Sequence, residues 1–143
     1  MSQSITHVSY FTVIMHALTG GRAYRGDESS PAGFLKLTTT GRKTGMQRTT
    51  ELVYLRDGAD YVVTASYGGG PRNPSWFYNL RSNPDVTIDV HGGRKRGVAE
   101  VADPEKRKEL WARLIAIAPM YRGYEKRTQR EIPMVIVHPA AEG

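Results

Sequence analysis

The chain has 143 residues, with 20 Lys and Arg against 14 Asp and Glu, so its formal net charge is +6. This length suits one domain with a substantial core, and the positive charge favours an acidic ligand: nucleic acid, an anionic membrane or a polyanionic small molecule. The absence of cysteine excludes disulfides and thiolate metal sites, and the four scattered histidines show no metal-ligand spacing.

The N-terminal part predicts a helix at 8–19 and a loop at 20–33. Its apolar run at 10–18 is too short to span a bilayer and has no basic segment or cleavage site of a signal peptide. The expected location is therefore the cytoplasm, and an association of this helix with a membrane surface is left open. We expect a single domain over 1–143, with 1–32 as its N-terminal helix and loop.

The rest of the chain predicts strands and helices that do not alternate as βαβ units. Strands joined by hairpins come first, and a helix capped by Asn73 with Pro74 at its first position follows. The later helix begins at Pro104 after an Asp103 cap, and a short tyrosine-bearing helix follows Pro119. The predicted strands are 34–40, 47–56, 61–66, 86–90, 97–101 and 133–138. This order indicates an α+β fold in which six antiparallel strands close into a small barrel flanked by helices.

The stretch LTTTGRKTG, residues 37–45, forms a basic turn between two strands. It is not a Walker phosphate loop, because four residues do not separate its first glycine from a Gly-Lys-Thr ending. Arg42 and Lys43 lie in the turn and Arg48 on the outgoing strand, so the three cations could form a compact anion site. The alternative is a solvated hairpin tip.

A glycine run follows the third predicted strand. Ala65 and Ser66 end that strand, and Gly68, Gly69 and Gly70 come next, where the backbone could approach a ligand closely. Trp76, at the start of the next helix, could floor a planar pocket or pack in the core.

Five segments in unbroken order resemble the deazaflavin-dependent nitroreductase family of actinobacteria. They are LTTTGRKTG, QRTTELVYLRDG, YVVTASYGGG, NPSWFYNLRSNPDV and PMYRGYEKRTQREIPMVIV, and they cover about residues 33–139. The resemblance implies a split β-barrel related to the FMN-binding split-barrel oxidases. It also implies coenzyme F420 as cofactor, a deazaflavin with a phosphate and an oligoglutamate tail.

The resemblance also assigns residues. The phosphate and tail would meet the basic turn, and the ring would meet the strand end and the glycine run, with Gly68 and Gly69 leaving space for it. The expected cofactor-binding residues are Arg42, Lys43, Thr44, Arg48, Ala65, Ser66, Tyr67, Gly68, Gly69, Arg72, Trp76 and Asn79.

This sequence departs from the family at Tyr67, where relatives often carry Lys or Asn, and Arg72 could replace that cation. Val53 stands where some relatives have a pocket tyrosine, and alternation sends Tyr54 to the opposite face. Tyr121 and Tyr124 share a helical face and, with Ser66, are the catalytic candidates, although the tyrosines could equally pack on the barrel. Thr128 and Arg130 are interpreted as structural or surface residues.

The family resemblance implies an oxidoreductase that moves hydride from reduced F420 to an electron-poor small molecule, such as an activated alkene, a quinone or a nitroaromatic. Nucleic acid is not the expected partner, and the chain would be a monomer or a homodimer. Two alternatives stay open: a basic barrel that binds single-stranded nucleic acid, and an FMN-binding or haem-related split-barrel protein.

Overall fold

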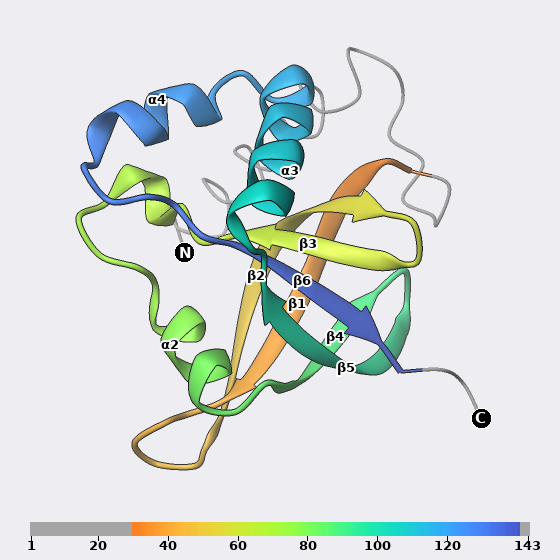
Figure 1. Cartoon of the computed structure of the whole chain (residues 1–143). Coiled ribbons are helices and arrows are strands. Elements are labelled where there is room, and N and C mark those ends of the chain that lie inside the picture. Colours follow the sequence, from red (N-terminus) through yellow and green to blue (C-terminus); the bar gives the residue numbers. More distant parts are fainter. Residues whose placement is uncertain (1–29, 141–143) are drawn as a thin grey trace, which may run out of the picture.

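The structure is a computed structural model that describes residues 30–140. Its centre is a closed barrel of six antiparallel strands (Figure 1). The order β1-β2-β3-β6-β5-β4 confirms the predicted fold class, while the helix predicted at 8–19 lies outside the described residues. The strands are β1 (Ala32–Thr40), β2 (Gln47–Asp57), β3 (Asp60–Thr64), β4 (Asp85–Val90), β5 (Gly93–Val101) and β6 (Met134–Pro139).

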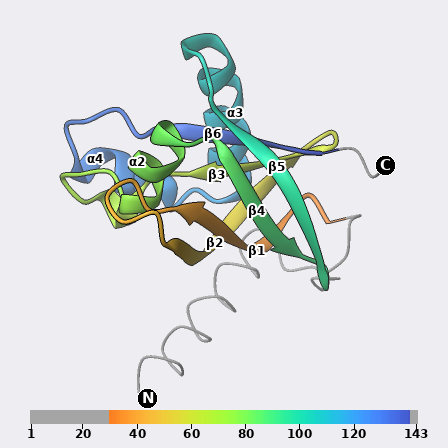
Figure 2. The same ribbon diagram turned by 90° about the horizontal axis from the view of Figure 1, so that it is seen from below.

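The helical elements lie outside the barrel wall and come in two consecutive pairs, η1 and α2 between β3 and β4, and α3 and α4 between β5 and β6. A single 3₁₀ turn, η1, follows β3, and α4 packs against that turn. Helix α2 lies beside the β1–β2 hairpin in both views, and Figure 1 places α4 on the same side of the barrel but well away from the hairpin tip (Figure 2). The helical elements are η1 (Tyr67–Gly69), α2 (Ser75–Ser82), α3 (Pro104–Ile117) and α4 (Tyr121–Arg127).

The last strand, β6, closes the barrel because it inserts between β3 and β5. Ile136 pairs with Val62 on one side and with Glu100 on the other. Closure leaves no free sheet edge, so the strands satisfy one another's backbone groups. It also brings the segment after α4 alongside the segment after β3, since the Ala65 amide donates to the Pro133 carbonyl at 2.9 Å.

Strands β3 and β6 are buried on both faces, which explains their nearly continuous apolar sequences. One face fills the barrel interior, and the other supports α3 and α4. Val62 and Ile136, for example, belong to the cluster under α3, whereas Val63 and Val137 belong to the interior cluster.

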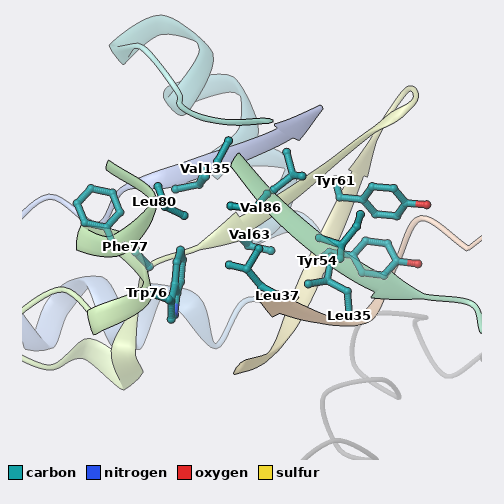
Figure 3. Packing of buried hydrophobic residues seen from close by; sticks show 14 of the residues in the cluster. Leu35, Leu37, Tyr54, Tyr61, Val63, Trp76, Phe77, Leu80, Val86 and Val135 are labelled. Atoms are coloured by element: carbon teal, nitrogen blue, oxygen red, sulfur yellow. The ribbon is translucent and has the colours of Figure 1, made fainter. Parts of the chain in front are cut away.

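Helix α2 closes one end of the barrel interior. Its side chains Trp76, Phe77 and Leu80 join the interior cluster, and Tyr54 and Tyr61 occupy the other end of that cluster (Figure 3). The Tyr54 ring is 1% exposed, which confirms that it points away from the outer face of β2. The apolar residues around Trp76 therefore close the barrel interior and do not form a free surface.

His138 fastens β6 to both neighbouring strands. Its Nε2 lies 2.8 Å from Glu100 Oε2 on β5, and its Nδ1 lies 3.1 Å from Asp60 Oδ2 on β3. Both ring nitrogens can donate at once only in the imidazolium form. The hydrogen bond to Glu100, helped by the one to Asp60, accordingly raises the His138 pKa above its ordinary value.

Several predicted boundaries were wrong. The strand β5 begins at Gly93 because Gly93 already pairs with Val90, and β3 ends at Thr64, before Ala65 and Ser66. The cap of α2 is Pro74 and not Asn73, whose side chain binds Arg130 instead. The Asp103 cap was correct: its Oδ1 accepts from the Lys106 amide at 2.8 Å.

Candidate functional site

The basic turn is a closed, rigid hairpin tip. The Gly41 amide donates to the Met46 carbonyl at 2.7 Å, and the Gly45 amide donates back to the Gly41 carbonyl at 2.8 Å. Gly45 has φ +74°, a left-handed conformation that glycine adopts without strain. Thr44 Oγ1 accepts from the Met46 amide at 3.2 Å, so this hydroxyl holds the turn together. Arg42 is exposed on its surface.

Asn79 ties this turn to α2. Its Oδ1 accepts from the Arg42 amide at 3.1 Å and faces Arg42 Nη1 at 3.4 Å, while its Nδ2 donates to Thr39 Oγ1 at 3.2 Å. Asn79 is 4% exposed and Thr39 is fully buried. Asn79, one of the predicted cofactor-binding residues, is through these contacts a buried anchor for Arg42.

Three cations are thus available at this end of the barrel. The Arg42 guanidinium stacks 5.1 Å from the centre of the Tyr78 ring, which further restricts its position. Arg48 pairs with Thr39 across the hairpin, so its side chain leaves the same sheet face on which Asn79 lies. Among the ion pairs within residues 30–140, none involves Arg42, Lys43 or Arg48. Their charge is free to meet an external anion.

The glycine run forms a left-handed turn after β3. Tyr67, Gly68 and Gly69 have φ values of 46°, 62° and 80°, which is unusual for the tyrosine. Ser66 just before them is right-handed. A right-handed residue followed by a left-handed one directs successive amides toward one side, where they can bind an anion or a carbonyl oxygen.

The two glycines predicted to leave space for a ring have different roles. A Cβ on Gly68 would meet nothing within 4 Å, as predicted. A Cβ on Gly69 would lie 2.9 Å from the Tyr124 carbonyl and 3.0 Å from Arg127 Cβ. The prediction that Gly69 leaves room for a ligand was therefore wrong: its missing side chain lets α4 pack on the loop.

Arg130 holds this loop from behind, a role that the sequence did not reveal. Its Nη2 donates to the Ser66 carbonyl at 2.9 Å, its Nε to the Gly70 carbonyl at 3.1 Å and its Nη1 to Asn73 Oδ1 at 2.6 Å. Thr128 Oγ1 accepts from the Arg130 amide at 3.3 Å. These acceptors are about sixty residues away in sequence, so no local pattern could identify them.

The remaining ring candidates divide by burial. Ala65 is fully buried and Trp76 is 6% exposed within the interior cluster, so the core interpretation of Trp76 holds. Tyr67 is 65% exposed, and its ring lies against Gly70. Arg72 is exposed on the connection to α2.

The two tyrosines of α4 also differ. Tyr121 is 6% exposed in the cluster under α3, and burial raises the pKa of its phenol. Its ring meets the Tyr124 ring edge-on at 5.2 Å. Tyr124 is half-buried and packs on the same cluster as Phe34 and Val53 of the barrel wall. Of the pair, Tyr124 is the better placed to touch a ligand.

A pocket of about 760 Å³ lies on the outer face of β1, β2 and β4. Lys36 lies between Glu51 and Asp89 across the three strands, and Phe34 and His91 also line it. None of the predicted cofactor residues, all within the described part of the chain, lines this pocket. Phe34 pairs with Val53, and both pack against the same buried cluster as Tyr124.

Within residues 30–140, no cluster of three His, Asp or Glu side chains could hold a metal ion. The helices in this part of the chain are also too short or too polar to cross a membrane.

Comparison with known proteins gives a consistent result. The profile of the family described as F420H(2)-dependent quinone reductase matches residues 13–139. The chain is 42% identical over 128 residues to an F420H(2)-dependent quinone reductase of Mycobacterium tuberculosis, covering 83% of this chain and 81% of that protein.

Two solved structures have similar folds. One is an F420-H2 dependent reductase, FDR-A, with 32% identity and a TM-score of 0.67, covering 73% of this chain and 93% of that one. The other is described as a domain-swapped dimer, with 27% identity and a TM-score of 0.68, covering 96% and 100%.

Proposed function

Because the chain belongs to the F420H(2)-dependent quinone reductase family, we propose that it is a reductase that uses coenzyme F420 to reduce a quinone. The split-barrel fold, the profile match and the mycobacterial relative support this function over a nucleic-acid-binding barrel. When bound, reduced F420 supplies the hydride, and the residues of this chain bind, orient and shield the reactants.

The observation that carries the proposal is the anchored Arg42. Asn79 and Tyr78 hold its side chain, and none of the described carboxylates neutralises it. The phosphate and carboxylates of the cofactor fit a rigid cation of this kind, with Lys43 and Arg48 adding to the field. The turn thus fits the anionic end of F420.

The loop Ser66–Gly70 fits the ring. The Gly69 and Gly70 amides donate to the Ser66 and Tyr67 carbonyls, so the ring would meet the Tyr67 and Gly68 amides, and a Cβ on Gly68 would enter open space. Backbone donors suit the carbonyl oxygens of a planar heterocycle and need no side chain between loop and ring. We assign the ring to this loop, with the Ser66 hydroxyl as a further contact.

Tyr124 is our candidate for the wall of the acceptor pocket. Together with Phe34 and Val53 it packs against the buried cluster under α3, and its backbone lies against Gly69. An apolar wall of this kind suits a flat quinone ring stacked near the loop. The Tyr124 phenol could pass a proton to the reduced quinone, whereas the buried Tyr121 supports Tyr124 from the core. The basic surface allows weak contact with an anionic membrane, where quinones reside.

The experiment that tests this function measures F420 affinity and quinone reduction together. Arg42→Ala combined with Lys43→Ala should weaken binding of the full cofactor by about tenfold or more, because each charge-assisted bond contributes about 1.5–3 kcal/mol. A control that removes two other exposed cations, Arg96→Ala with Lys108→Ala, should bind normally. An unchanged dissociation constant in the first variant would remove the turn from the site, and failure of the wild type to oxidise reduced F420 with a naphthoquinone would refute the function.

The oligomeric state is a separate proposal. A relative of similar fold forms a domain-swapped dimer, and we propose that this chain forms a homodimer. Light scattering behind size exclusion would give its mass, and a monomer at the concentrations used for turnover would reject the dimer.

A further inference from the structure

We propose that Arg130 is a positioning residue of the ring site, which fixes the direction of the Tyr67 amide through the Ser66 carbonyl. This inference rests on the proposed function, because it assumes that the ring binds at the Ser66–Gly70 loop. It assigns a functional role to a side chain that would otherwise be read as part of the scaffold.

The first support is the geometry of the guanidinium. Three of its nitrogens donate to three acceptors of the same loop region, the carbonyls of Ser66 and Gly70 and the side chain of Asn73. These acceptors span both ends of the left-handed turn. A planar fork can satisfy them together, whereas a lysine ammonium on a flexible stem cannot reproduce their directions.

The second support is the peptide between Ser66 and Tyr67. A trans peptide is planar, so its C=O and N–H point in opposite directions. Because Arg130 and the Gly69 amide both donate to the Ser66 carbonyl, the Tyr67 N–H must point away from Arg130, toward the other side of the loop. The positively charged guanidinium that donates to the Ser66 carbonyl also polarises this peptide and strengthens the Tyr67 N–H as a donor.

The third support is the strain of the loop. Tyr67 has φ 46°, which is uncommon for a residue with a side chain and persists only where its surroundings enforce it. The Gly70 amide donates to the Tyr67 carbonyl at 3.0 Å, and Arg130 holds the peptides on both sides. Without Arg130, the Ser66–Tyr67 peptide could rotate toward a relaxed conformation.

The charge of Arg130 is not neutralised locally. Its partners among the described residues are two carbonyls and one amide oxygen, and none of the ion pairs in residues 30–140 includes it. Burial lowers the pKa of its guanidinium, which nonetheless stays protonated at neutral pH. The loop therefore presents a charge-assisted amide to an oxygen acceptor of a planar ligand ring.

The test compares two ligands, full F420 and the deazaflavin riboside that lacks the phosphate and tail. Arg130→Ala should weaken both about tenfold, so the ratio of the two dissociation constants stays constant. Arg42→Ala with Lys43→Ala should weaken only the full cofactor. Millimolar guanidinium chloride should restore riboside binding to Arg130→Ala, whereas the same concentration of sodium chloride should not. Arg130→Lys should bind weakly and should not respond to guanidinium.

Binding is measured at a temperature where circular dichroism shows a folded protein, and Arg130→Lys serves if Arg130→Ala does not fold. Riboside affinity equal to wild type in a folded Arg130 variant would overturn the positioning role, even if that variant melts earlier. Weak riboside binding by a folded Arg130→Ala variant that guanidinium does not restore would overturn it as well. A wild-type protein that binds neither ligand would instead refute the proposed function.

Discussion

Replacing Asn79 by leucine should loosen the basic turn and lower both stability and cofactor affinity. The change removes hydrogen bonds at 3.1 Å to the Arg42 amide and at 3.2 Å to Thr39 Oγ1, and the longer 3.4 Å contact to Arg42 Nη1 adds little. Each net bond contributes about 0.5–1.5 kcal/mol, and Thr39 is left in a fully buried position without this donor. We expect a loss of about 2 kcal/mol, or roughly 6–8 °C in Tm.

The effect on binding follows from the freed turn. Ordering one backbone residue costs about 1–2 kcal/mol. In the variant, F420 binding must supply this cost to order Arg42, so the cofactor should bind about tenfold more weakly. Thermal unfolding by circular dichroism and titration with F420 measure the two effects. Ser82→Ala, an exposed position of the same helix, is the control and should change neither. An Asn79→Leu variant that melts and binds like wild type would show that α2 does not anchor the turn.

Three other predictions concern the barrel seam, the acceptor and the glycine loop. Because the His138 pKa is raised when folded, its contribution to stability is present below pH about 6.5 and is lost as pH rises through the folded value. The melting temperatures at acidic and alkaline pH should therefore differ less in His138→Gln than in wild type. An equal difference in the two proteins would show that His138 and its contact with Glu100 do not cause the pH dependence of stability. If the Tyr124 phenol delivers a proton, Tyr124→Phe should lower kcat with KM for the quinone little changed, and if only its ring matters, Tyr124→Ala should raise KM while Tyr124→Phe matches wild type. Wild-type kinetics in both variants would assign Tyr124 to the core. Of the two loop glycines, Gly68→Ala should weaken ligand binding and Gly69→Ala should lower the melting temperature.

The fold followed from the sequence because its signals are local. Turn glycines, the Asp103 cap and alternating apolar residues each act over a few residues, and they gave the strands, helices and barrel class. The boundary of β5 was missed because Arg94, Lys95 and Arg96 are too polar to suggest a strand. They pair with β4 nevertheless, since one face of that hairpin is exposed and tolerates charge.

The site was only partly predictable because its organisation depends on long-range contacts. The basic turn could be identified from the spacing of its cations, but nothing near Asn79 indicated that it holds Arg42 across 37 residues. The prediction that Asn73 caps α2 was wrong for the same reason. Its side chain instead accepts a charge-assisted hydrogen bond from Arg130, which is remote in the sequence. A buried polar residue whose partner is remote is visible only when the elements are packed.

The two glycines of the loop offer a matched test of this distinction. Both are left-handed, so an alanine at either position carries a similar backbone penalty of about 1 kcal/mol. The Cβ of Gly69→Ala would also collide with the Tyr124 carbonyl at 2.9 Å, whereas that of Gly68→Ala enters open space. Overpacking costs typically about 1–3 kcal/mol, so Gly69→Ala should melt roughly 3–10 °C below Gly68→Ala. In contrast, Gly68→Ala should stay folded but bind the tail-less deazaflavin more weakly, because its methyl group occupies the space in front of the loop. Equal melting temperatures would show that α4 does not press on Gly69, and normal riboside binding by Gly68→Ala would place the ring elsewhere.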